Sequence, residues 1–356
     1  MIRRTVPQKT ISKETKLSGV GLHTGEHVNI TFKPAPADTG LVFVREDIKG
    51  DNLINAHIKY ISNTDRGTNL DNGSFRIHTC EHVLAAITGL EIDNCYICLD
   101  GPEVPIMDGS SKFFINALEE AKIVEQNVLR EEFFPSESIT YECEDSGSKI
   151  SIIPDDNYKV NTIVDYKTKV LGEQEASINH ISEFKKEISS ARTFSFLHEL
   201  ETLLENGLIK GGDLNNAIVY VDKPLAESNM DILKKAFNKD SISVTPNGIL
   251  DNLNLHYPNE AARHKLLDVI GDLALIGMKI RGKIIAEKPG HSINAKFADK
   301  VSEVIRSDRK NTLPKIDFNK KSLMDSNQIM KVIPHRPPFL LIDEVLEISE
   351  SHVIGL

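Results

Sequence analysis

The stretch Glu260–Gly277 reads EAARHKLLDVIGDLALIG. Its apolar residues recur at helical spacing and a glycine ends the pattern, so we predict a long helix over residues 260–276. His264, Asp268 and Asp272 stand at i, i+4 and i+8, which puts them on one face of that helix. These metal-capable side chains face away from most of the apolar stripe, although the same spacing also fits an ordinary solvated helix face.

The residues around this helix repeat an order found earlier in the chain. In both places a helix, a glycine, a strand, a Pro/Gly-rich loop and a second helix follow one another, which predicts a duplicated α+β unit. The expected elements are helix 79–88, a strand around Ile97 and helix 111–123 in the first half, and helix 260–276, strand 279–286 and helix 292–304 in the second.

The rest of the chain supplies strands, a connection and a C-terminal segment. Alternating stretches at 28–32 and 41–44 predict strands, and the Glu-rich stretch 129–138 predicts the connection between the halves. Residues 306–328 are polar and basic without periodicity, which is typical of a linker. We therefore expect domains at 1–127 and 128–305, a linker at 306–328, and at 329–356 a segment too short to bury a core, so that the chain stops partway through a third domain.

Composition excludes several classes of protein. The 356 residues carry a net charge of -10, so no bulk basic field exists to hold a nucleic acid. No apolar run approaches the ~20 residues of a membrane span. The basic N-terminal residues are not followed by the apolar segment of a secretory signal, so we expect a cytoplasmic protein. Four cysteines are too few for a disulfide framework, and Cys95 and Cys98 lie in a predicted strand, where residues three apart point to opposite faces.

Three further residues are suited to hydrolytic chemistry. A zinc hydrolase needs three nitrogen or oxygen ligands and a carboxylate near the attacking water. Glu81 and His82 are neighbours on the helix of the first half, so one of them can bind a metal while the other reaches the water from the side. His291 precedes a helix and has a pKa range suited to protonating an amine. Each of these residues, taken alone, also fits an ordinary surface or capping role.

Seven motifs, taken together, resemble the UDP-3-O-acyl-N-acetylglucosamine deacetylases, the zinc amidases of lipid A biosynthesis. They occur in the family's order across about residues 1–305. The motifs are GVGLHTG (19–25), PAPADTG (34–40), HTCEH (78–82), PIMDGS (105–110), ARTF (191–194), RHKLLD (263–268) and GHS (290–292).

The resemblance assigns roles by position. It makes His82, His264 and Asp268 the zinc ligands and Glu81 the general base. It implies that the Thr193 hydroxyl stabilises the oxyanion, that His291, held by Asp272, protonates the leaving amine, and that Lys265, Phe194 and His23 lie near the substrate. The family fold implies an α+β protein with two similar halves, each with a sheet, and the helices packed between the sheets.

The substrate of this family carries a long acyl chain, which implies a hydrophobic passage. Residues 194–217 resemble the insert that builds this passage, with apolar side chains followed by the pair Gly211-Gly212. From the residues alone, a helix with an ordinary core stripe remains the alternative.

The C-terminal residues resemble a second family. The stretch IMKVIPHRPPFLLID (329–343) is similar to the opening of a 3-hydroxyacyl-acyl-carrier-protein dehydratase of the hotdog fold, a fatty acid biosynthesis enzyme, with His335 at the catalytic histidine. We therefore expect a bifunctional fusion cut short within an incomplete hotdog domain. Dehydratase activity is not expected of this chain, and an acyl-carrier protein is expected as a partner only of the full-length fusion.

These observations predict a zinc-dependent deacetylase that releases acetate from UDP-3-O-((R)-3-hydroxyacyl)-N-acetylglucosamine. Two alternatives remain: a zinc amidohydrolase acting on another N-acyl sugar or a peptide, and a non-catalytic binding or scaffolding protein. A zinc protease is disfavoured because the HExxH helix motif is absent.

Overall fold

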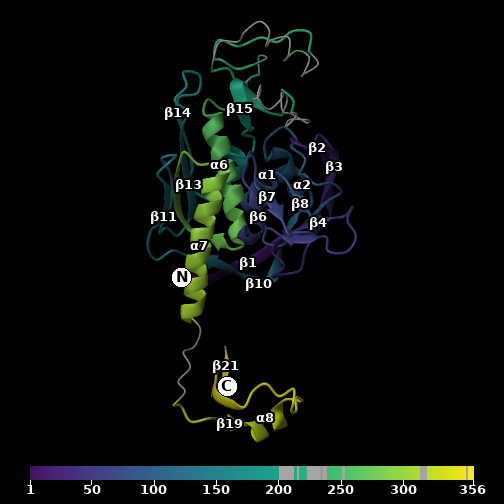
Figure 1. The fold of residues 1–356 in the computed structure, drawn as a ribbon, viewed down its shortest axis with the longest axis vertical. Helices are drawn as coiled ribbons and strands as arrows, with labels where there is room; N and C mark the ends of the chain where they lie inside the picture. Colours follow the sequence, from purple (N-terminus) through teal and green to yellow (C-terminus); the bar gives the residue numbers. More distant parts are fainter. Residues whose placement is uncertain are drawn as a thin grey trace. The chain divides into compact units, whose positions relative to one another are not determined.

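The computed structural model shows a mixed α+β protein of two compact units, Met1–Ile305 and Arg306–Leu356 (Figure 1). In the described residues, no helix is both long enough and apolar enough to cross a membrane. The structure describes residues 1–199, 212–214, 216–222, 234, 239–250, 253–312, 319–349 and 352–356.

A five-stranded sheet occupies the first part of the larger unit. Its inner strands show the alternation that the sequence predicts: Val28, Ile30 and Phe32 are fully buried, with more exposed residues between them. The strand that contains Cys95 and Cys98 lies at the centre of the sheet, as expected of a buried strand, and both thiols are free. The strands, in sheet order, are β2 (Thr15–Val20), β3 (His27–Pro34), β9 (Cys95–Leu99), β4 (Leu41–Arg45) and β5 (Leu53–Asn55).

A second five-stranded sheet follows later in the chain with the same series of pairings. In both sheets the first three strands are antiparallel, the third and fourth are parallel, and the fourth and fifth are antiparallel. Its strands, in sheet order, are β11 (Ile139–Cys143), β12 (Ser148–Ile153), β18 (Gly282–Glu287), β13 (Tyr158–Asp165) and β14 (Glu173–Ile178).

Smaller sheets complete the larger unit. They are β1 (Ile2–Ile11), β10 (Ile123–Phe133) and β17 (Lys279–Ile280); β6 (Ile61–Asn63), β7 (Asn69–Asp71) and β8 (Arg76–Ile77); and β15 (Phe194–Phe196) with β16 (Ile218–Tyr220).

Strand β10 corrects our expectation of a connection over residues 129–138, because the strand continues to Phe133. Two of the charged residues of this segment are paired inside the protein. Arg130, whose side chain is 3% exposed, contacts Asp93 at 2.7 Å, and Glu132 contacts Arg281 at 2.6 Å. Partners distant in sequence therefore let a charged segment lie in a buried strand.

The helices lie where the sequence predicts them, but their ends differ. The main helices are α1 (Glu81–Gly89), α2 (Lys112–Glu120), α6 (Glu260–Leu273) and α7 (His291–Thr312), with the short α3 (Phe184–Glu187) and 3-10 turns at Ile58–Tyr60, Ile181–Glu183 and Ala274–Ile276. Thr79 has φ 58°, so α1 begins only at Glu81. Strand 279–286 is divided between β17 and β18, and α7 extends through residues 306–312, which we expected to belong to the linker.

The helices form the middle of the larger unit (Figure 1). Every residue of α1 is buried, and α1 contacts both α2 and α6. On the outer sides, α2 contacts β2, whereas α6 contacts β13 and β14. The central pair, α1 and α6, is therefore held between the two five-stranded sheets.

Glycine permits the close contact between α1 and α6. A Cβ on Gly271 of α6 would lie 2.1 Å from the Glu81 carbonyl oxygen at the start of α1. Because that neighbour is backbone, no side-chain rotation relieves the clash, and the two helices would have to separate.

The smaller unit consists of β19 (Met324–Asp325), α8 (Ser326–Val332), β20 (Glu344–Ile348) and β21 (Val353–Gly355), with the strands in the order β19-β20-β21. Asp325 and Gln328 form a reciprocal capping box that starts α8. Phe339 and Leu341 are 74% and 88% exposed, so the apolar motif that follows His335 is not covered by the described part of this unit.

We predict that Gly271→Ala lowers the free energy of unfolding by about 2 kcal/mol, because overpacking at the α1–α6 contact outweighs the better helix propensity of alanine. Gly290→Ala is the matched control, since a Cβ there meets nothing within 4 Å. Chemical denaturation of both variants measures the difference. Equal stability of Gly271→Ala and wild type would contradict the close contact.

Candidate active site

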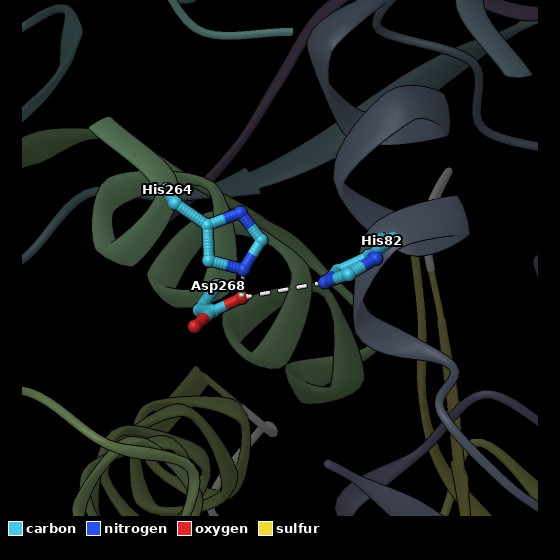
Figure 2. A group of neighbouring side chains, drawn as sticks. All are labelled: His82, His264 and Asp268. Atoms are coloured by element: carbon cyan, nitrogen blue, oxygen red, sulfur yellow. Dashed lines mark ion pairs between the residues drawn. The ribbon is translucent and has the colours of Figure 1, made fainter. Parts of the chain in front are cut away.

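The contact between α1 and α6 brings three metal-capable side chains together. His82 from α1 points toward His264 and Asp268 from α6 (Figure 2). One possible ligand atom from each residue lies within 4.8 Å of the others, and all three residues are at most 4% exposed. The nearest nitrogen of His82 lies 3.8 Å from Asp268 Oδ1, and that of His264 lies 3.3 Å from the same oxygen.

Neighbouring contacts prepare this cluster for a cation. His264 Nδ1 donates to the Ala191 carbonyl oxygen at 3.1 Å, which leaves the Nε2 lone pair facing the cluster. Asp268 Oδ1 is buried, and no residue in the described part of the chain donates a hydrogen bond to it. Two imidazole nitrogens and an unpartnered carboxylate oxygen match the donors that zinc prefers, so the residues fit a divalent metal.

Protonation in the cluster follows from burial and from one lysine. Burial, with the adjacent His264, lowers the pKa of His82 to about 3, and burial also lowers the pKa of His264, so both rings are neutral at pH 7. Burial alone would raise the pKa of Asp268, but Lys265 and the nearby histidines hold it well below its usual range. The cluster thus presents the protonation states that a metal site requires.

Glu81 lies beside the cluster as the first residue of α1. It is 2% exposed, and its Oε2 accepts the backbone N–H of Thr68 at 2.9 Å. Burial raises the pKa of Glu81 to about 7, with Asp272 and Asp268 adding to the shift and His291 opposing it. A carboxyl group with this pKa is suited to accept a proton near neutrality.

His291, the first residue of α7, faces the cluster from the other side. Its Nδ1 contacts Asp272 Oδ2 at 2.9 Å, and its Nε2 lies 4.0 Å from Glu81 Oε1 and 3.9 Å from Asp268 Oδ2. Although burial alone would lower the pKa of His291, Asp272 and Asp268 raise it to about 9. The ring is therefore cationic at neutral pH.

Lys265 and the segment before β15 border the cluster. Lys265 Nζ donates to Asp268 Oδ2 at 2.8 Å and lies 5.6 Å from the centre of the Phe194 ring. The Phe194 and His264 rings contact one another edge to face, with their centres 6.2 Å apart. Thr193 precedes Phe194, and its backbone is fixed through a bond of 2.8 Å to the Gly109 carbonyl oxygen.

His23 lies in a loop that is hydrogen-bonded to the Glu103 carboxylate. Both Glu103 carboxylate oxygens accept the His23 N–H, and Glu103 also accepts the Thr79 hydroxyl near the start of α1. Between His23 and the three metal-capable residues, the described part of the chain shows no hydrogen bond or ion pair. Of the predicted acyl-passage insert, residues 200–211 and 215 lie outside the described residues.

Two residues that the sequence patterns do not single out bind the Asp272 carboxylate. Thr68 donates its hydroxyl to Oδ1 at 2.5 Å, and Asn294 Nδ2 donates to Oδ2 at 2.7 Å. Asn294 follows His291 by three residues on α7, so helical spacing could have identified it. Thr68 carries no such signal.

Comparison with known proteins agrees with this geometry. A family model of the UDP-3-O-acyl N-acetylglycosamine deacetylases matches residues 8–232 and 226–303. The chain belongs to this family. The resemblance predicted from the motifs is thereby confirmed, and the His82–His264–Asp268 cluster lies in a member of a metalloenzyme family.

Relatives of two kinds match this deacetylase-family chain. A bifunctional LpxC/FabZ enzyme of Bacteroides thetaiotaomicron is 40% identical over 98% of this chain and 76% of its own length, and one of Porphyromonas gingivalis is 41% identical over 98% and 75%. A UDP-3-O-acyl-N-acetylglucosamine deacetylase of Myxococcus xanthus is 36% identical over 83% of this chain and 86% of its own length. The chain thus combines a deacetylase-family region with part of a FabZ-type fusion, as predicted.

We predict that His264→Ala binds much less zinc than wild type, because the substitution removes one of the three side chains of the buried His82–His264–Asp268 cluster. His27→Ala, on the exposed end of β3, is the control and keeps its metal. Metal content per chain after dialysis measures both. Full zinc occupancy in His264→Ala would contradict the assignment of this cluster as the metal site.

Proposed function

We propose that this chain hydrolyses the N-acetyl group of UDP-3-O-((R)-3-hydroxyacyl)-N-acetylglucosamine and releases acetate, a step of lipid A biosynthesis. One observation carries the proposal: a buried His82–His264–Asp268 cluster lies beside Glu81 and the His291–Asp272 pair in a chain of the deacetylase family. A metal-dependent amide hydrolase uses these three components: a metal site, a base and an acid.

His82, His264 and Asp268 would hold the metal, which we propose is zinc. When bound there, zinc supplies Lewis acidity that polarises the acetamide carbonyl and makes a water molecule more acidic. Lys265 occupies the second oxygen of Asp268, which leaves Oδ1 as the oxygen directed at both histidines.

Glu81 acts as the general base. Its Oε2 is held by the Thr68 N–H, whereas its Oε1 faces His291. With a pKa of about 7, the carboxylate takes a proton from the attacking water as the oxygen–carbon bond forms. Burial, which destabilises the charged carboxylate, makes Glu81 a stronger base than a surface glutamate.

His291 supplies the proton that the departing amine requires. Asp272 accepts the Nδ1–H, so the Nε2–H is available toward Glu81 and the cluster. As the carbon–nitrogen bond breaks, this proton passes to the amine nitrogen and the sugar leaves as a neutral amine. The cationic ring also stabilises negative charge that develops on the carbonyl oxygen.

The remaining assignments concern the substrate. The Thr193 hydroxyl is proposed to donate to the oxyanion, because its segment lies beside α6 through the Ala191–His264 bond and the Phe194–His264 ring contact. Lys265 and Phe194 are proposed to contact the substrate from the same side. For His23 we propose a place near the substrate, with the described link through Glu103 to the start of α1 as support.

We also propose the finer organisation expected from the sequence. The two five-stranded sheets with the same pairings support two similar halves at 1–127 and 128–305. A linker within the expected range 306–328, after the end of α7, and the start of a hotdog domain at 329–356 follow. A cytoplasmic location is proposed for the enzyme. An acyl-carrier protein is proposed as a partner only of a longer chain with a complete dehydratase domain.

We predict that Glu81→Gln keeps its zinc but loses about 10²–10⁴-fold in kcat, because the amide has the same shape and does not accept the proton. Glu46→Gln, on a surface ion pair with Lys33, is the control. Acetate release and metal content are measured on the same samples. Turnover by Glu81→Gln at the wild-type rate would exclude Glu81 as the base.

The substrate is tested by comparing acetate release from the 3-O-acylated UDP-sugar with release from its unacylated analogue. We predict that the wild-type chain has a kcat/KM at least about tenfold higher for the acylated substrate, since burying several methylene groups contributes about 0.8 kcal/mol each. Zinc-loaded protein that hydrolyses neither compound, or prefers another N-acyl sugar, would overturn the proposed substrate.

A further inference from the structure

Thr68 lies between the two buried carboxylates of the site. It belongs to the loop between β6 and β7 and is 1% exposed. We propose that Thr68 is a positioning residue that holds the Glu81 carboxylate and the Asp272–His291 pair in register. This inference rests on the proposed function, because it assigns to Thr68 the alignment of the base with the acid.

Thr68 donates one hydrogen bond to each carboxylate. Its backbone N–H donates to Glu81 Oε2 at 2.9 Å, and its hydroxyl donates to Asp272 Oδ1 at 2.5 Å. Two buried carboxylates repel one another unless donors or cations lie between them. Because both donors belong to one residue, the spacing between the carboxylates is fixed by the short distance from its amide to its hydroxyl.

The hydroxyl has a function that the other neighbours of Asp272 do not duplicate. Oδ2 accepts from His291 Nδ1 and from Asn294 Nδ2, whereas the Thr68 hydroxyl is the donor to Oδ1 within the described residues. Asp272 is 1% exposed, so water does not readily replace a lost donor. Without the hydroxyl, Oδ1 loses its described donor, and the carboxylate can turn about its two remaining contacts at Oδ2, which changes the direction in which it holds the His291 ring.

The loop itself is bound to the start of α1. The Thr68 carbonyl oxygen accepts the Cys80 N–H at 3.1 Å and the Cys80 thiol at 3.2 Å. On the preceding residue, a Cβ at Gly67 would lie 3.2 Å from Glu81 Oε1, so the loop passes close to both carboxylate oxygens. Thr68 therefore joins the beginning of α1 to Asp272 of α6, 204 residues further along the chain.

Substitutions separate the hydroxyl from the backbone contact. Thr68→Val has nearly the same shape and keeps the N–H to Glu81, whereas Thr68→Ser keeps both donors. We expect Thr68→Val to lower kcat by about 10–100-fold, the range typical of residues that orient a catalytic ligand, with KM and zinc content unchanged. We expect the kcat of Thr68→Ser to lie within about threefold of the wild-type kcat, because serine keeps the hydroxyl that orients Asp272.

Thr10→Val is the matched control for loss of a buried threonine hydrogen bond. Thr10 lies in β1 and is 6% exposed, and its hydroxyl donates to the Asn94 carbonyl oxygen at 2.7 Å. It should lose stability comparably while keeping kcat. A Thr68→Val kcat equal to that of wild type, or a Thr68→Ser kcat as low as that of Thr68→Val, would overturn the inference.

A double-mutant cycle tests whether Thr68 acts through Asp272. If it does, Thr68→Val lowers kcat strongly in the wild-type background and less than about twofold in the Asp272→Ala background. A purely structural role predicts the same loss in both backgrounds, which would contradict the proposal.

A spectroscopic measurement separates this inference from the proposed function. In protein labelled with ¹⁵N-histidine, Thr68→Val should shift the His291 Nδ1–H signal, whereas Thr10→Val and Thr68→Ser should leave it unchanged. If the wild-type chain releases no acetate, the proposed function fails, and this signal alone decides the positioning role. An unshifted signal in Thr68→Val overturns it.

Discussion

The site depends on the packing of α1 against α6. His82 and Glu81 come from α1, whereas His264, Asp268 and Asp272 come from α6, so neither helix contains a site by itself. Gly271 sets their separation, because its missing side chain admits the Glu81 carbonyl oxygen. The sheets on either side hold the helices together, and the geometry of the site is a consequence of core packing.

Burial shifts the pKa values of the residues in the site, and a few neighbouring charges limit or reverse these shifts. The same desolvation that keeps His82 and His264 neutral raises the pKa of Glu81. Lys265 and His291 supply positive charge next to Asp268 and Asp272. One environment therefore yields two neutral imidazoles, a basic carboxyl group and a cationic imidazolium, each because of its nearest neighbours.

Local sequence patterns predicted the elements whose position depends on the burial of nearby residues. Apolar periodicity located α1, α6 and the central strand β9, since it reports burial directly, and the helical spacing of His264 and Asp268 placed both on one face. The prediction that His82 joins His264 and Asp268 in one site came from the family resemblance. Helix ends were less accurate: Thr79 adopts a left-handed conformation stabilised by tertiary contacts, including its hydroxyl bond to Glu103.

Features that depend on distant partners were not predictable from local patterns. Strand β10 looked like a connection because the partners of Arg130 and Glu132, Asp93 and Arg281, lie far away in the sequence. Thr68 was missed for the same reason. Such residues become visible only when the fold has brought the two ends of the interaction together.

The most direct test of a metal site between α1 and α6 is zinc K-edge X-ray absorption on the full chain loaded with one zinc per molecule. We predict two imidazole ligands at about 2.0–2.1 Å and a carboxylate oxygen at about 2.0–2.2 Å. We also predict that one imidazole is lost in His82→Ala, because among the described residues His82 is the member of the cluster that α1 supplies. A sulfur ligand at about 2.3 Å, or an unchanged spectrum in His82→Ala, would contradict a metal site built from α1 and α6.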